Sequence, residues 1–124
     1  MKKQIASKKV ASAPKILSQG IESGGFVFLS GQIGSDTDWK IALGGIGAET
    51  KQALENIKIL LEETGLGMDD IVKVTIYVTD ISLAPEINEI YSTYFNEPLP
   101  AREMVGVKEL PLGAMIEISV VASR

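Results

Sequence analysis

With 124 residues, 45% of them hydrophobic and 23% charged, the chain is long enough for one ordinary domain and too short for two independent cores. We therefore predict a single domain over residues 1–124. Cysteine and histidine are both absent, which excludes disulfides, thiol nucleophiles, histidine-dependent triads and the usual zinc sites. No segment approaches the roughly 20 apolar residues of a membrane helix, and no apolar run follows the basic N-terminus, so we expect a cytoplasmic protein.

The formal net charge of −4 is unevenly distributed. Four lysines and no acid occupy the first nine residues, and the remaining chain carries 8 basic against 16 acidic residues. Such an acidic body repels a phosphate backbone, which argues against nucleic acid as a partner. A basic arm that contacts nucleic acid is one interpretation of the lysines; we favour an edge strand whose lysines discourage pairing between sheets.

The first half of the chain predicts a central strand, a hairpin or loop, and a helix. Residues 25–32 are apolar on both parities and bounded by glycines, as in a strand that is covered on both faces. Residues 34–40 are rich in turn formers and precede a short apolar piece at 41–43, which indicates a hairpin or a mobile loop. One helical stripe follows, made of Ala53, Leu54, Ile57, Leu60 and Leu61, and Gly65 is its natural stop.

The second half alternates strand, helix and two strands. Residues 72–78 show a period of two with β-branched residues, a helix follows from Ser82 and ends before Pro98, and residues 102–108 and 114–122 form two strands. Two helices cover only one face of such a sheet. Because Tyr77, Val121 and residues 26–29 also make the other face apolar, we expect a second subunit to cover it, as in a homo-oligomer.

Arg102 is the first candidate for chemistry. It follows the stiff segment Pro98-Leu99-Pro100, and its planar guanidinium matches two oxygens of a carboxylate or phosphate. The alternative is an ordinary ion pair at the end of a strand with Glu103 or Glu109.

Glu117 is the second candidate, because it lies within the last strand between two isoleucines. If the strands that carry Arg102 and Glu117 are antiparallel neighbours, one side chain binds an anion and the other activates water. The alternative is an ordinary solvated glutamate.

Other patterns carry less weight. Ser30-Gly31-Gln32 could present backbone N–H groups and a hydroxyl to a ligand, although a plain turn explains it as well. Residues 44–47 lack the spacing of a nucleotide-binding loop. The acidic residues at 62–63 and 69–70 are better explained as solvated surface than as metal ligands, and Tyr91, Tyr94 and Phe95 as core than as base-stacking groups.

Several segments together resemble the reactive-intermediate deaminases, the Rid or YjgF-type proteins. They recur in order over nearly the whole chain, and they are residues 30–33, 44–46, 50–58, 70–73 and 88–91, Pro100-Ala101-Arg102, Leu110-Pro111 and Ile116-Glu117-Ile118. The resemblance implies a chorismate-mutase-like α+β fold, with a six-stranded, mainly antiparallel sheet and two helices on one face. It also implies a homotrimer with sites between subunits.

The resemblance further implies an activity. Active members of the family hydrolyse 2-imino acids such as 2-iminobutanoate and 2-iminopropanoate, released by pyridoxal-phosphate enzymes, to 2-oxo acids and ammonia without a metal or organic cofactor. Arg102 matches the arginine that binds the substrate carboxylate, and Glu117 matches the glutamate that positions water. Ser30, Gly31 and Asn88 match residues that line the pocket.

Three residues depart from the family pattern. Leu17 replaces a tyrosine at the pocket mouth, Glu103 replaces a small serine, and Met104 stands where cysteine or threonine is common. Glu103 could compete for Arg102, although strand alternation points the two side chains apart. Two alternatives therefore stay open: an endoribonuclease or translation inhibitor, and a noncatalytic trimer that binds a small carboxylate and regulates a partner.

Overall fold

The computed structural model describes all 124 residues, which form one seven-stranded sheet and two α-helices. The elements are β1 (Lys3–Ile5), β2 (Gly20–Ser23), β3 (Phe26–Leu29), β4 (Gln32–Ile33), α1 (Ile46–Glu62), β5 (Ile71–Val78), α2 (Ala84–Tyr91), β6 (Ala101–Gly106) and β7 (Ile116–Ser123). Short 3₁₀ turns lie at Met68–Asp70, Ile81–Leu83, Ser92–Tyr94 and Pro111–Gly113. Neither helix combines the length and hydropathy needed to cross a bilayer.

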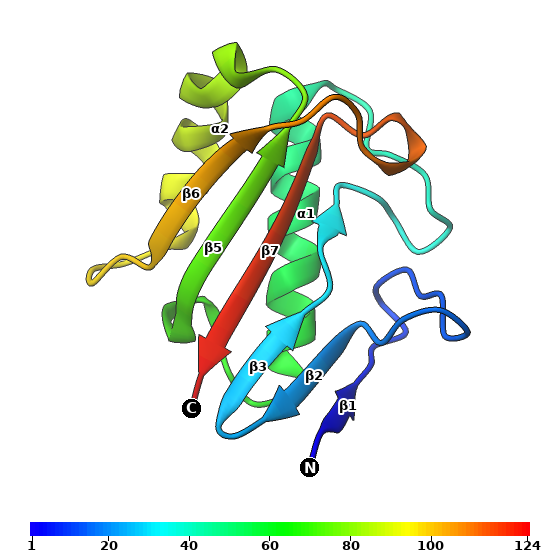
Figure 1. Ribbon diagram of the computed structural model, residues 1–124. Helices are drawn as coiled ribbons and strands as arrows, with labels where there is room; N and C mark the ends of the chain where they lie inside the picture. Colours follow the sequence, from blue (N-terminus) through cyan, green and yellow to red (C-terminus); the bar gives the residue numbers. More distant parts are fainter.

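The strands follow the order β1-β2-β3-β7-β5-β6, and β4 pairs with β7 as well (Figure 1). Every pairing is antiparallel except that of β5 with β6. The α+β, mainly antiparallel architecture is thus confirmed. The lysine-bearing N-terminus also forms an edge strand, since β1 pairs only with β2 and contains Lys3.

The predicted count of six strands is wrong, because residues 25–32 do not form one continuous strand. β3 ends at Leu29, and Ser30 donates its backbone N–H to the carbonyl of Gln19. The chain then rejoins the sheet as β4, where Gln32 and Ile33 pair with β7. The break leaves Ser30 and Gly31 outside the ladder, beside β7.

Both helices pack on one face of the sheet, as predicted, and lie behind it in Figure 1. The predicted stripe of α1 is fully buried. It packs against the inward side chains of β5 and β7, which alternate along each strand and are Val74, Ile76, Val78, Ile116, Ile118, Val120 and Ala122. Gly65 follows the helix with a φ of 79°, the left-handed conformation that ends helices.

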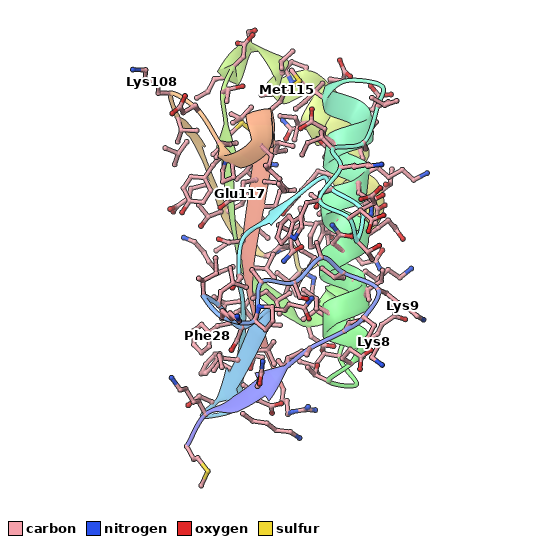
Figure 2. The ribbon with its side chains drawn as sticks, turned by 90° about the vertical axis from the view of Figure 1, so that its right-hand side faces the viewer. Lys8, Lys9, Phe28, Lys108, Met115 and Glu117 are labelled. Carbon is pink, nitrogen blue, oxygen red and sulfur yellow. The ribbon has the colours of Figure 1, made fainter.

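The opposite face of the sheet carries no helix and is partly apolar. Phe26 and Phe28 are 44% and 46% exposed, and Phe28 lies opposite Val121 of β7 in the antiparallel register. Figure 2 shows the sheet edge-on, with Phe28 on the side away from α1. The second apolar face is therefore present, and its burial by another subunit stays a prediction.

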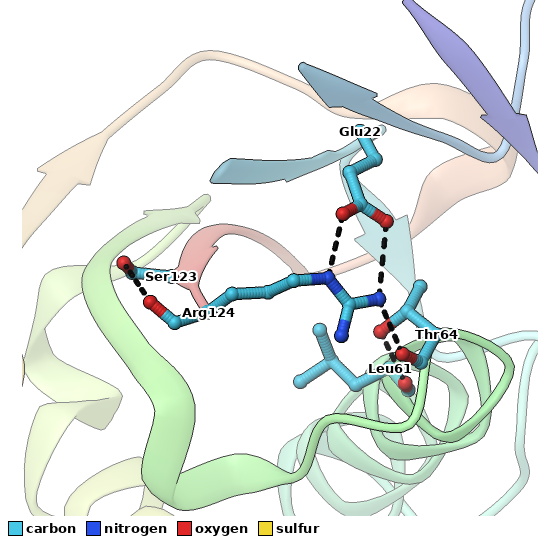
Figure 3. A network of polar contacts seen from close by, with 5 residues as sticks. All are labelled: Glu22, Leu61, Thr64, Ser123 and Arg124. Atoms are coloured by element: carbon cyan, nitrogen blue, oxygen red, sulfur yellow. Dashed lines mark hydrogen bonds and ion pairs between the residues drawn. The ribbon is translucent and has the colours of Figure 1, made fainter. Parts of the chain in front are cut away.

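A polar network ties the end of β7 to β2 and to the end of α1 (Figure 3). The Arg124 guanidinium binds both carboxylate oxygens of Glu22, with N···O distances of 2.6 and 3.2 Å, and donates to the carbonyl of Thr64 at 2.6 Å. A cation there satisfies a carbonyl at the negative end of the helix dipole.

Candidate functional site

Arg102 lies on the edge strand β6, where α2 holds its guanidinium. Its register partner on β5 is Val74, whose side chain is buried under the helices, so Arg102 shares the helix-covered face. Nη1 donates to Oδ1 of Asn88 at 2.8 Å, and Cζ lies 4.8 Å from the centroid of the Tyr91 ring. Asn88 and Tyr91, both on α2, thus fix the guanidinium by a hydrogen bond and a cation–π contact.

No carboxylate pairs with Arg102, so the interpretation as an ordinary strand-end ion pair is wrong. Glu103, the neighbour that could compete, points to the other face and pairs with Lys73 at 2.8 Å. The alternation of side chains along β6 separates the two, as the sequence predicted. The fork of Arg102 is free to bind two oxygens of a ligand.

The Arg102 side chain lines a depression of about 290 Å³ beside α2. Its lining consists of Asn88, Tyr91, Ser92, Phe95, Leu99, Pro100 and Arg102. The rings of Tyr91 and Phe95, which both line it, have centroids 4.4 Å apart. The cis peptide between Glu97 and Pro98 precedes the segment that enters β6.

Glu117 lies on β7 opposite Tyr77, on the face that carries no helix. The carboxyl group is half-buried, and this burial raises the pKa of Glu117. Gly31 leaves the space that the carboxyl group occupies: a methyl group at residue 31 would lie 2.8 Å from Cδ of Glu117. A carboxyl group whose pKa is raised by burial is suited to take a proton from water.

Glu117 lines a depression of about 710 Å³. Its lining consists of Ala13, Ile16, Leu17, Ser30, Gly31, Ile33, Trp39, Pro111, Leu112 and Glu117. Three predicted pocket residues, Leu17, Ser30 and Gly31, are therefore brought together with Glu117. The Ser30 hydroxyl donates its hydrogen to the carbonyl of Ser18 at 2.6 Å. Its oxygen can therefore act toward a ligand only as a hydrogen-bond acceptor.

The condition that the strands carrying Arg102 and Glu117 are antiparallel neighbours is not met. After α2 the chain crosses over and adds β6 parallel to β5, so β5 separates β6 from β7. Arg102 also shares the helix-covered face, whereas Glu117 lies on the open face. Within one chain the candidate residues therefore form two separate groups, which we call half-sites. One consists of Arg102 and Asn88, and the other of Glu117, Leu17, Ser30 and Gly31.

Two residues of these half-sites escaped the sequence reasoning. The sequence pattern predicts that Tyr91 belongs to the core, and Tyr91 is buried, but its ring also contacts the Arg102 guanidinium. Its position three residues after Asn88 on the same helix is the signal that places the two side chains on one face. Trp39, the single tryptophan, lines the Glu117 depression from the segment that the sequence predicted as a hairpin or a mobile loop, and the structure confirms the hairpin.

Known proteins resemble this chain over most of its length. A family model described as Endoribonuclease L-PSP matches residues 8–124. A RutC family protein of Aquifex aeolicus is 49% identical over 109 residues, with coverage of 86% of this chain and 87% of the relative. A 2-iminobutanoate/2-iminopropanoate deaminase of Dermatophagoides farinae is 40% identical over 118 residues, with coverage of 94% and 92%. The crystal structure of E. coli TdcF with bound serine matches with a TM-score of 0.90 at 30% identity, covering 98% of each chain.

Proposed function

Because the chain belongs to the endoribonuclease L-PSP family, which includes the Rid proteins, we propose that it hydrolyses reactive 2-imino acids to 2-oxo acids and ammonia. Relatives that are 37–40% identical carry the name 2-iminobutanoate/2-iminopropanoate deaminase. The observation that supports the proposal most strongly is the pair of half-sites: a guanidinium without a carboxylate partner and a half-buried carboxyl group with a raised pKa.

The two half-sites need a second subunit to form one site. We propose a homotrimer in which the open sheet face is buried and Arg102 of one subunit lies across the interface from Glu117 of its neighbour. The exposure of Phe26 and Phe28 on that face supports burial in an assembly. A heterologous interface that closes after three subunits would repeat the same site three times.

The proposed reaction uses one water and no cofactor. The fork of Arg102 binds the substrate carboxylate, and Asn88 and Tyr91 keep the guanidinium in place. Glu117 takes a proton from water as the oxygen adds to the imine carbon, and it returns that proton to the imine nitrogen, which gives a tetrahedral intermediate with one hydroxyl and one amino group. Glu117 then takes the hydroxyl proton and delivers it to the amino group as the C–N bond breaks, so the products are the 2-oxo acid and ammonia. Ser30, Gly31 and Leu17 line the space around the reacting carbon.

A coupled assay tests this proposal. Threonine dehydratase, a pyridoxal-phosphate enzyme, releases 2-iminobutanoate, and the protein should accelerate formation of 2-oxobutanoate. Arg102→Ala should lose about 100-fold or more of kcat/KM because the substrate is no longer oriented. Lys108→Ala removes an exposed cation beyond the other end of β6 and is the matched control, expected to retain full activity. No acceleration by pure protein would contradict the proposal.

An endoribonuclease is the second candidate, favoured by the description of the matching family. The net charge of −4 and the absence of histidine disfavour it, because RNA binding relies on cations and RNA cleavage commonly uses histidine. RNA cleavage that survives extensive purification and disappears in Arg102→Ala would establish this activity instead.

A noncatalytic carboxylate-binding trimer that regulates a partner is the third candidate, favoured by the bound serine in TdcF. Crystals soaked with 2-oxobutanoate would show whether Arg102 binds the ligand. Binding at Arg102 together with an inactive coupled assay would favour this function over the deaminase.

A further inference from the structure

The hairpin before α1 is fixed by hydrogen bonds along its whole length. Ser35 and Ile41 form a bridge across its base, and Asp36 donates its N–H to the carbonyl of Lys40 at 2.9 Å. The Asp36 carboxylate accepts the N–H groups of Asp38 and Lys40 at 2.9 and 3.0 Å. Such side-chain bonds to the following backbone stabilise a tight turn, so the hairpin is preformed.

The tip of this hairpin carries Trp39 in an unusual backbone conformation. Its φ is 62°, in the left-handed region that bulky residues rarely adopt. A residue held in a sparsely populated region persists where the surrounding structure over-determines it, often at ligand sites. The side chain is 41% exposed and lines the Glu117 depression instead of entering the core.

The remaining walls of the depression are mostly apolar. Ile16, Leu17 and Leu112 line it, and each is also an exposed hydrophobic side chain. Leucine at position 17 offers no hydroxyl to a ligand. The polar side-chain groups of the lining are those of Glu117 and Ser30 together with the indole N–H of Trp39, and the other side chains of the lining are apolar.

We propose that this site prefers 2-imino acids with bulky apolar side chains, aromatic or branched aliphatic, and that Trp39 determines this specificity. The inference rests on the proposed function. With the substrate carboxylate at Arg102 and the imine carbon at Glu117, the side chain extends toward Trp39, Ile16 and Leu17. Ligand pockets are lined mainly by hydrophobic and aromatic side chains with a few polar groups that fix orientation, and the lining of this depression has that composition.

A substrate series tests the preference. An L-amino-acid oxidase generates the imines of alanine, leucine and phenylalanine in place, and semicarbazide traps whatever imine the protein has not hydrolysed. Each buried methylene contributes about tenfold or more to kcat/KM in an apolar pocket. The leucine and phenylalanine imines should therefore exceed the alanine imine by at least about tenfold. Equal values, or a preference for the alanine imine, would overturn the inference while leaving the deaminase function intact.

Trp39→Ala should lower the ratio of kcat/KM for the leucine imine to that for the alanine imine by about tenfold, because the side chain loses its principal apolar contact. Leu43→Ala is the matched control. Leu43 lies near the same hairpin and is 95% exposed, but it does not line the Glu117 depression, so the ratio should stay unchanged. An unchanged ratio in Trp39→Ala would remove its role in specificity.

A binding measurement separates failure of the preference from failure of catalysis. Trp39 is the single tryptophan, so its fluorescence reports directly on this depression. We expect 4-methyl-2-oxopentanoate to change that fluorescence with a dissociation constant at least about tenfold below that of 2-oxobutanoate. This result would support the preference even if no imine were hydrolysed, in which case the proposed function alone would fail. Equal dissociation constants would overturn the preference.

Discussion

At the scale of single residues, Gly31 and Glu117 are coupled by direct contact. The absence of a side chain at Gly31 gives the Glu117 carboxyl group its position at the wall of the depression. Ser30, next to Gly31, is anchored through its N–H to Gln19 and its hydroxyl to Ser18. The backbone of residues 30–31 therefore sets where the carboxyl group can lie.

Gly31→Ala should displace the Glu117 carboxyl group while leaving the core intact, because the clash falls on the end of a flexible side chain. We expect a loss of about 100-fold in kcat/KM, the effect of misplacing a reacting group by about 1 Å. Gly67→Ala is the control, since a methyl group there meets nothing within 4 Å and φ is −137°. Equal activity in the two variants would show that Gly31 does not position the carboxyl group.

Glu117→Gln should remove about 100-fold or more of the activity, the usual contribution of a general base. Because the pKa of Glu117 is raised, this carboxylate takes up a proton at a higher pH than an ordinary carboxyl group. As the pH is lowered, the wild-type kcat/KM should therefore begin to fall while the pH is still above the ordinary carboxyl range. A profile of kcat/KM against pH measures this. An acid limb that persists unchanged in the residual activity of Glu117→Gln would assign the titration to another group.

The same pKa shift predicts that stability falls as the pH rises, whereas activity falls as the pH is lowered. The folded chain holds the Glu117 proton more tightly than the unfolded chain, so the contribution of this group to stability is lost as pH rises through the raised pKa. Glu117→Gln should therefore raise Tm by a few degrees at most at pH 7, with no gain at a pH below the ordinary carboxyl range. Calorimetry at the two pH values checks the sign.

The sequence indicated individual candidate residues better than it indicated how those residues lie relative to one another in the sheet. Arg102 and Glu117 could be picked out by their motifs, and alternation correctly separated Arg102 from Glu103. Their separation by β5 could not be predicted, because hydrophobic alternation does not encode which strands are neighbours. The sequence predicted a hairpin or a mobile loop around Trp39, but the place of Trp39 in the lining of the Glu117 depression depends on the hydrogen bonds of Asp36, which composition does not reveal.

At the scale of elements, one buried side chain holds the segment that forms the rim of the Glu117 depression. Gln19 is buried, accepts the N–H of Ser7 at 2.6 Å and donates to the carbonyls of Ser7, Val10 and Ala11 at 2.9–3.1 Å. Ala13, Ile16 and Leu17 follow directly and line the depression. Gln19 thus connects the N-terminal segment to the site.

Gln19→Leu should destabilise the protein by about 2 kcal/mol or more, because it leaves buried backbone groups without partners. Amide exchange in residues 6–17 should accelerate more than in α1, since the lost bonds belong to that segment. Gln52→Leu, on the partly buried side of α1, is the comparison variant. Uniform exchange throughout the chain would show that Gln19 does not hold this segment specifically.

Helices and strands were predictable where the hydrophobic periodicity is strong. They were less predictable where a single hydrogen bond determines where a strand ends. The stripe of α1 and the alternation of β5 reflect burial against one core, so the sequence contains them directly. The break between β3 and β4 depends on the N–H of Ser30 turning toward Gln19. Both parities of residues 26–29 are apolar because one set faces the core and Phe26 and Phe28 face outward.

At the scale of the whole molecule, the two half-sites predict that activity belongs to the assembly. Arg102→Ala and Glu117→Gln subunits should each retain only about 1% or less of the wild-type kcat/KM when they assemble alone. When they are unfolded together and refolded, a site between subunits regains both side chains if the right neighbours meet. Random mixing at equal amounts should restore about a quarter of the wild-type activity, because each site draws one side chain from each of two adjacent subunits.

The controls are each variant refolded alone, which should show no recovery, and wild type refolded alone, which sets full activity. Analytical ultracentrifugation of the mixture checks that trimers have formed. A properly assembled mixture without recovered activity would contradict a site shared between subunits and would require Arg102 and Glu117 to act independently.

The place of β7 in the sheet also governs when the molecule can fold during synthesis. Of all the elements β7 is made last, yet it lies between β3 and β5 and also pairs with β4. Until residues 116–123 leave the ribosome, those strands lack their shared neighbour, and such non-local pairing forms late. Nascent chains stalled before Ile116 should remain sensitive to protease and available to chaperones, and protection should appear abruptly once β7 emerges.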